Sequence, residues 1–127
     1  MSQHNEVGKI GEDLGRRFLE KQGYKIIEQN YRTKYAEIDL VAQHKKCLVF
    51  VEVRTKVGEN FGTPEETINK AKLRKVLWNA KTYSAFKNWQ GPARIDAICI
   101  VLKALSRSLT GEADYSVERL NHYENIV

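Results

Sequence analysis

The strongest constraint on the fold is a mostly apolar run in the C-terminal third of the chain, Ile95–Leu102. A strand with one face in water alternates apolar and polar residues, whereas an unbroken apolar run is typical of a strand buried on both faces. The chain must therefore cover a sheet on both sides. Its 127 residues, 42% hydrophobic and 29% charged, are enough for such a core and are not the composition of a disordered chain.

Apolar residues at helical spacing predict a first helix over Val7–Gln22. Glycines recur along it at steps of three and four, at Gly8, Gly11 and Gly15. Each weakens a helix interior, so we expect the stripe to mark close packing on a sheet or on a second helix, with contact to a ligand as the alternative.

Three strands are predicted next, joined by short polar links that favour an antiparallel meander: Tyr24–Arg32, Tyr35–Ala42 and Cys47–Thr55. Thr63-Pro64-Glu65-Glu66 then has the pattern of a capping box and predicts one long helix from Thr63 to about Lys87.

After the apolar strand, Lys103–Asp114 is expected to be a polar connection and Tyr115–Leu120 an edge strand. The predicted fold class is α/β, a mixed β-sheet of order α-β-β-β-α-β flanked by helices. Because no linker or repeat divides the chain, residues 1–127 are expected to form a single domain, with a core of about 7–102 and an edge strand and tail over 103–127.

Composition excludes several classes of protein. No apolar run is long enough to span a bilayer, and Met1–Glu12 lacks the apolar core of a signal peptide, so we expect a cytoplasmic protein without a membrane partner. Cys47 and Cys99 lie in apolar runs without metal-ligand spacing, which indicates buried reduced thiols. The net charge of +5 is compatible with an anionic partner such as nucleic acid.

Carboxylates on two of the predicted strands are the most informative feature for function. Glu37 and Asp39 share one face of the second strand, and Glu52, Arg54 and Lys56 share one face of the third. A short hairpin brings Asp39 and Glu52 side by side, where each raises the pKa of the other unless a cation lies between them. Such oxygen ligands suit Mg²⁺ or Mn²⁺, and a neighbouring cationic group suits phosphodiester hydrolysis. The alternative is an exposed strand face whose charges serve solubility.

The order and spacing of several short segments resemble the YraN-like family of small bacterial proteins, within the PD-(D/E)XK nuclease superfamily. The segments are Gly11-Glu12, Asn30-Tyr31-Arg32, Glu37-Ile38-Asp39-Leu40, Phe50-Val51-Glu52-Val53-Arg54, Lys72 and Arg94-Ile95-Asp96. The resemblance implies a restriction-endonuclease-like core, similar to that of archaeal Holliday-junction resolvases.

The resemblance also implies a metal-dependent endonuclease that hydrolyses DNA, with branched or single-stranded DNA as expected substrates. Asp39 and Glu52 are then the metal ligands, with the backbone carbonyl of Val53 and the first-helix carboxylate of Glu12 as further ligands. The alternative for Glu12 is a surface charge or an ion pair with Arg94. Glu37, Arg94 and Asp96 are expected to support the site, the latter two as an ion pair that orders the sheet.

Arg54 departs from the superfamily pattern, which usually has lysine at this position. Arginine stays protonated and cannot act as a general base, but it can bind phosphate oxygens and stabilise charge in the transition state. Water activation is then left to the metal, or to Lys56 or Lys72. Arg54 also keeps open the alternative of a catalytically weak or inactive nucleic-acid-binding module with a nuclease fold.

We expect DNA contacts to be mostly to phosphates, and therefore structure-selective or weakly selective for sequence. The candidate contact residues are Arg32, Lys34, Lys56, Lys70, Lys72, Arg74 and Lys75. Trp78 and Trp89 are candidates for stacking on bases, although packing is the commoner role of such residues. Resolvase-like relatives are often dimers, so a homodimer fits the resemblance. A scaffold protein whose acidic face binds another protein is a third reading.

Overall fold

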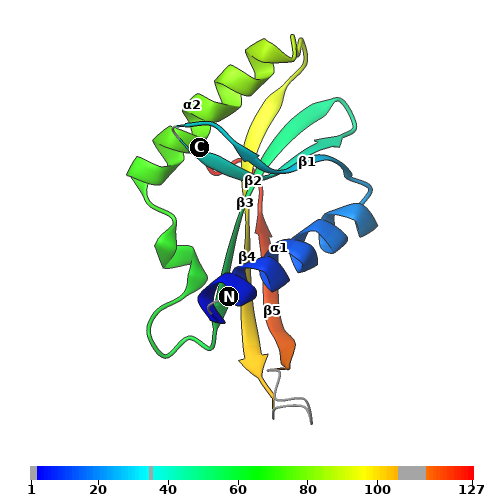
Figure 1. Ribbon diagram of the computed structural model, residues 1–127. Helices are drawn as coiled ribbons and strands as arrows, with labels where there is room; N and C mark the ends of the chain where they lie inside the picture. Colours follow the sequence, from blue (N-terminus) through cyan, green and yellow to red (C-terminus); the bar gives the residue numbers. More distant parts are fainter. Residues whose placement is uncertain (1–2, 35, 106–113) are drawn as a thin grey trace.

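The computed structural model describes residues 3–34, 36–105 and 114–127 (Figure 1). The predicted start of a strand at Tyr35 and most of the predicted connection Lys103–Asp114 lie outside these residues. The elements are α1 (Gln3–Lys21), β1 (Lys25–Arg32), β2 (Glu37–His44), β3 (Cys47–Val57), the 3₁₀ helix η1 (Pro64–Thr67), α2 (Lys70–Phe86), β4 (Ala93–Ala104) and β5 (Tyr115–Tyr123).

The five strands form one mixed sheet in the order β1-β2-β3-β4-β5. The first three are antiparallel neighbours, which confirms the predicted meander. The chain then crosses over through η1 and α2, so that β4 pairs with β3 in parallel, and β5 returns antiparallel to β4 as an edge strand. The predicted α/β class and element order are therefore confirmed.

The two long helices cover opposite faces of the sheet, with α1 crossing one side and α2 lying on the other (Figure 1). Alternation along β3 explains how one strand serves both layers: Val49, Val51 and Val53 pack in the cluster under α1, and Phe50 packs with Tyr83 of α2. In β4, residues 95–102 are all buried, as expected for a strand covered on both faces. Within the described residues, no helix is long and apolar enough to cross a membrane.

The long helix predicted from Thr63 to Lys87 is wrong, because the segment forms two helices. Thr63 caps η1 as expected, with its side chain accepting a hydrogen bond from the backbone N–H of Glu66. The chain then becomes extended at Ile68, and Asn69 caps a second helix by accepting from the N–H of Lys72. Two capping residues six positions apart thus start two separate helices.

The glycine stripe of α1 has two different roles. A Cβ atom at Gly11 would lie 1.7 Å from Oγ1 of Thr55, and one at Gly15 would lie 3.4 Å from a methyl group of Val53. Gly11 therefore lets α1 lie directly on β3, as the spacing predicted, whereas a Cβ at Gly15 would make only an ordinary van der Waals contact. Gly8 differs, because a Cβ there would meet nothing within 4 Å.

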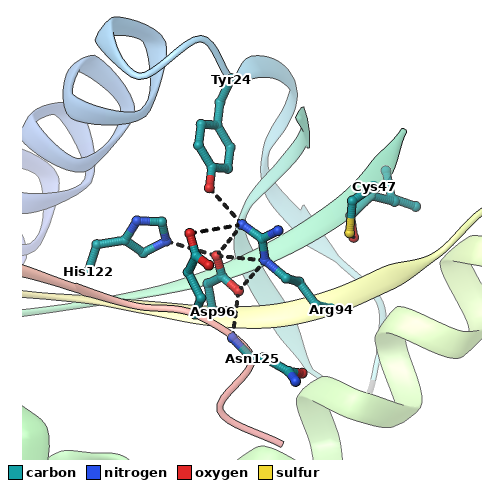
Figure 2. A network of polar contacts seen from close by, with 8 residues as sticks. Tyr24, Cys47, Arg94, Asp96, His122 and Asn125 are labelled. Carbon is teal, nitrogen blue, oxygen red and sulfur yellow. Dashed lines mark hydrogen bonds and ion pairs between the residues drawn. The ribbon is translucent and has the colours of Figure 1, made fainter. Parts of the chain in front are cut away.

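A network of polar contacts ties the C-terminal end of the chain to the sheet (Figure 2). Asp96, fully buried on β4, accepts from the guanidinium of Arg94 at 2.9 Å, contacts His122 of β5 at 2.8 Å and accepts from the N–H of Asn125 at 3.0 Å. Arg94 also donates to the hydroxyl of Tyr24 at 2.6 Å. Burial alone would raise the pKa of Asp96, but these hydrogen bonds outweigh it and lower the pKa.

Candidate functional site

A cavity of about 750 Å³ opens where α1, β2, β3, the loop 58–62, η1 and α2 meet. Glu12 of α1, Asp39 of β2, and Arg54 and Lys56 of β3 line it. Lys72, in the first turn of α2, also lines the cavity. The crossover from β3 through η1 to α2 therefore brings one basic side chain, Lys72, to the cavity that Glu12 and Asp39 also line.

Three carboxylates lie close together here, and we call Glu12, Glu37 and Asp39 the carboxylate triad; Glu12 and Asp39 line the cavity, whereas Glu37 does not. Each offers one oxygen, and these oxygens all lie within 4.8 Å of one another. With its amide nitrogen turned toward them, Asn30 donates to Glu37 at 2.9 Å and to Glu12 at 3.1 Å. The pKa of Glu12 is raised, first by burial and then by the charge of Asp39. The triad thus concentrates negative charge that one amide only partly offsets.

Asp39 occupies the point at which β2 and β3 separate. The paired register of these strands runs from His44 opposite Cys47 to Leu40 opposite Val51, and Asp39 follows directly. Its Oδ2 accepts a hydrogen bond of 2.8 Å from the backbone N–H of Val53. Burial raises the pKa of Asp39, although this hydrogen bond and the charge of Arg54 act in the opposite direction.

The Arg54 guanidinium lies among groups that the sequence assigned to a metal ion. It donates to Oε2 of Glu52 at 2.6 Å and to the carbonyl of Val53 at 2.8 Å, and Nη1 lies 3.6 Å from Oδ2 of Asp39. Asp39 and Glu52 are thus brought to the same cation, but Glu52 is not a member of the carboxylate triad. Asp39 belongs to the carboxylate triad and also lies beside Arg54, so Arg54 connects Glu52 with the triad.

Glu52 is more deeply buried than Asp39, with 3% of its side chain exposed against 13% for Asp39. One oxygen binds Arg54, whereas Oε1 is buried and has no hydrogen-bond partner among the described residues. Burial raises the pKa of Glu52 to about 7, and the neighbouring charge of Asp39 adds to the rise. A buried carboxyl with an unsatisfied oxygen is costly, and such sites are common where proteins bind ligands or do chemistry.

The other predicted residues divide by position. Of the predicted DNA contacts, Lys56 and Lys72 line the cavity, whereas exposed Arg74 and Lys75 do not. Arg32 is exposed and forms an ion pair with Glu37, its Nε lying 3.3 Å from Oε2.

Two further predicted DNA contacts, Lys34 and Lys70, and the predicted supporting residue Arg94 stand apart from the carboxylate triad. Lys34 and Lys70 are exposed outside the cavity lining. Arg94 forms the expected ion pair with Asp96 at the start of β4, in the network of Figure 2 rather than in the cavity. Glu12 faces Asn30, and the alternative pair between Glu12 and Arg94 is absent from the described contacts.

Sequence reasoning did not connect several residues with the site, among them Asn30, Gly8 and Phe61. Asn30 belongs to a matched segment, but only the fold brings it to Glu12 and Glu37. Gly8 and Phe61 line the cavity, and Phe61 lies in a loop without helical or strand periodicity. The two glycines that bound this loop were the only available signal that it turns sharply.

Comparison with known proteins identifies the relatives of the chain. The family model described as "Uncharacterised protein family UPF0102" matches residues 11–100, a range that holds Glu12, Asp39, Glu52 and Arg54. A UPF0102 protein of Cytophaga hutchinsonii is 43% identical over 98 residues, which are 77% of this chain and 87% of that protein.

Two further relatives match over nearly the whole chain. A UPF0102 protein of Caldanaerobacter subterraneus is 38% identical over 94% of this chain and 92% of its own length. A UPF0102 protein of Lawsonia intracellularis is 37% identical over 95% of this chain and 84% of its own length. Both the family match and these identities extend across the helices and strands that build the cavity, and the chain therefore belongs to the UPF0102 family.

Proposed function

We propose that this protein is an endonuclease that uses Mg²⁺ or Mn²⁺ to hydrolyse DNA phosphodiester bonds. The observation that carries the proposal is the convergence of Glu12, Glu37 and Asp39, two of which, Glu12 and Asp39, line a cavity together with Arg54 and Lys72. Carboxylates beside cations, in one hollow large enough for a phosphate and its neighbours, are the groups that phosphoryl chemistry requires.

The residues present fit a divalent ion. Carboxylate oxygens are hard ligands of the kind that Mg²⁺ and Mn²⁺ prefer. Glu12, Glu37 and Asp39 would hold the ion, and the unpartnered Oε1 of Glu52 is a further donor close to Asp39. When bound, the ion supplies a Lewis acid that polarises the phosphate and acidifies water.

The protein's own cations have distinct parts in this proposal. Arg54 stays protonated, so it donates hydrogen bonds to phosphate oxygens and offsets the charge that develops during hydrolysis. Lys56 and Lys72 neutralise the phosphates that flank the reacting one. None of these contacts reads a base edge, so the substrate is chosen by its structure rather than by its sequence. The free thiols of Cys47 and Cys99 fit a cytoplasmic setting for this activity.

A second candidate is a nucleic-acid-binding module with the same fold and little or no catalysis. Arg54 favours it, because its guanidinium already binds Glu52, the carbonyl of Val53 and Asp39. In this case the arginine is a permanent internal counter-ion, and the basic groups around the cavity only hold DNA.

Cleavage assays on single-stranded, duplex, flap and four-way DNA, each with Mg²⁺, Mn²⁺ or EDTA, test the proposal. We expect metal-dependent cleavage of at least one substrate, lost in Asp39→Asn and Glu52→Gln with DNA binding retained. The matched control is Asp13→Asn, which removes a half-exposed carboxylate of α1 that pairs with Arg17 and does not line the cavity. If folded wild-type protein binds DNA but cleaves none of the substrates with either metal, the binding module replaces the endonuclease.

A further inference from the structure

Phe61 stands out because its large apolar side chain is almost completely in water at the edge of the candidate site. It is 95% exposed and lines the same cavity as Asp39 and Arg54. Scattered exposed apolar residues are ordinary on protein surfaces, so exposure alone indicates nothing. What distinguishes this ring is its position beside carboxylates and cations, where no apolar partner from the described chain covers it.

The loop that carries Phe61 is held in place at both ends. Gly58 and Gly62 adopt positive φ angles of 70° and 111°, and the N–H of Gly58 donates to the carbonyl of Leu102. Arg119 of β5 donates to Glu59 at 2.9 Å, and Nζ of Lys56 donates to the carbonyl of Phe61 at 3.4 Å. The ring is therefore presented on an anchored turn, so binding a flat partner has a small ordering cost.

The charges nearest the ring limit the chemistry of that partner. Lys56 and Lys72 line the cavity with Phe61 and attract an anion, a charge that the phosphates of a nucleic acid carry. An aromatic side chain beside a basic groove is the arrangement by which proteins hold single-stranded nucleic acid, with bases stacked on rings and phosphates paired with cations.

We propose that Phe61 stacks on an unpaired nucleobase next to a phosphate bound in the cavity. The bases of an intact duplex have their faces covered by neighbouring base pairs, so only single-stranded DNA, or the single-stranded part of a branched DNA, presents a free face. This inference rests on the proposed function for the position of the phosphate, and it specifies the substrate class of that site. Trp78 and Trp89, the stacking candidates from the sequence, do not line the cavity.

Binding assays in EDTA test the inference apart from cleavage. The probes are a single-stranded oligonucleotide that contains 2-aminopurine and the same oligonucleotide in a duplex. We expect Phe61→Ala to weaken single-strand binding by about 5- to 150-fold, the range measured for loss of one base–aromatic stack. The affinity of Phe61→Ala for the duplex should change less than about twofold. Phe61→Trp, which keeps an aromatic ring, should bind the single strand as the wild type does. The fluorescence of 2-aminopurine should be quenched on binding only when residue 61 is aromatic.

The matched control is Phe86→Ala, which removes another exposed phenylalanine, 78% exposed at the end of α2 and outside the cavity. Unchanged single-strand binding in Phe61→Ala, or an equal loss with duplex DNA, overturns the inference. The two proposals fail separately. If wild-type protein cleaves DNA but Phe61→Ala leaves the preference for single strands unchanged, only the stacking is wrong. If no DNA is cleaved but the binding pattern holds, only the endonuclease is wrong.

Discussion

Replacing Glu52 with glutamine should make the protein more stable at neutral pH, because the buried carboxyl resists ionisation. Burial, followed by the charge of Asp39, raises its pKa from the ordinary 4.5 to about 7. Between these two values the unfolded chain loses the proton while the folded chain keeps it. The folded state then binds more protons, so the free energy of unfolding falls as pH rises through this window.

The size of the effect follows from the two pKa values of Glu52. Their separation corresponds to about 3 kcal/mol at pH values above 7, since each pKa unit is ~1.4 kcal/mol. Glutamine has nearly the shape of the protonated side chain and keeps an oxygen that can accept from Arg54. The variant should therefore match the wild type near pH 4.5 and be about 3 kcal/mol more stable at pH 8.

Urea unfolding between pH 4.5 and 8, in EDTA and at fixed ionic strength, measures this difference. The control is Glu118→Gln, which removes an exposed carboxylate of β5. A difference between Glu52→Gln and wild type that stays constant across this pH range would refute the reasoning. Saturating Mg²⁺ should reduce the difference at pH 8, because a bound dication stabilises the ionised carboxylate in the folded state.

Three further outcomes are expected from the packing of the described residues. Gly11→Ala should destabilise the protein by about 1–3 kcal/mol, because the new Cβ would overlap the Thr55 side chain of β3. Gly8→Ala should stabilise it by ~1 kcal/mol, because alanine has the higher helix propensity and a Cβ there meets nothing within 4 Å. Urea unfolding measures both differences. Asp96→Asn should cost about 3 kcal/mol by the same assay, because it leaves a guanidinium without its carboxylate. Cys99 is buried, and its pKa is raised to about 11, so a thiol reagent should label half-buried Cys47 first and Cys99 only after unfolding.

Local pattern was sufficient for much of the fold. The apolar run at Ile95–Leu102 predicted a doubly covered strand, and the structure buries all of it. Glycine spacing predicted close packing of the first helix, and Gly11 meets β3 directly. The division of the helix after Thr67 could not be predicted in this way, because Thr63 and Asn69 are both good caps and tertiary contacts decide whether the chain continues between them.

Less of the candidate site could be predicted from the sequence pattern. Alternation placed Glu37 and Asp39 on one face of β2, and the structure brings both to Glu12. The contact with Glu12 depends on how α1 crosses the sheet, which a helix pattern does not encode. The partners of the Arg54 side chain could not be predicted either. Strand alternation gives the face of the sheet on which a residue lies, but not the group that its long side chain reaches.

Arg54 is the cation that compensates the buried carboxylates of the site. Its guanidinium offsets the charge of Asp39 and Glu52. The compensation is incomplete, because Oε1 of Glu52 is buried and accepts no hydrogen bond from the described residues. A dication at the carboxylate triad would lower the pKa of Glu52, and it would compete with Arg54 for Asp39. In the proposed function, ion binding, ionisation of Glu52 and release of the guanidinium toward a phosphate would therefore be one linked equilibrium. A lysine at position 54 has a single ammonium and could not bridge Glu52, a backbone carbonyl and Asp39 with the same planar fork.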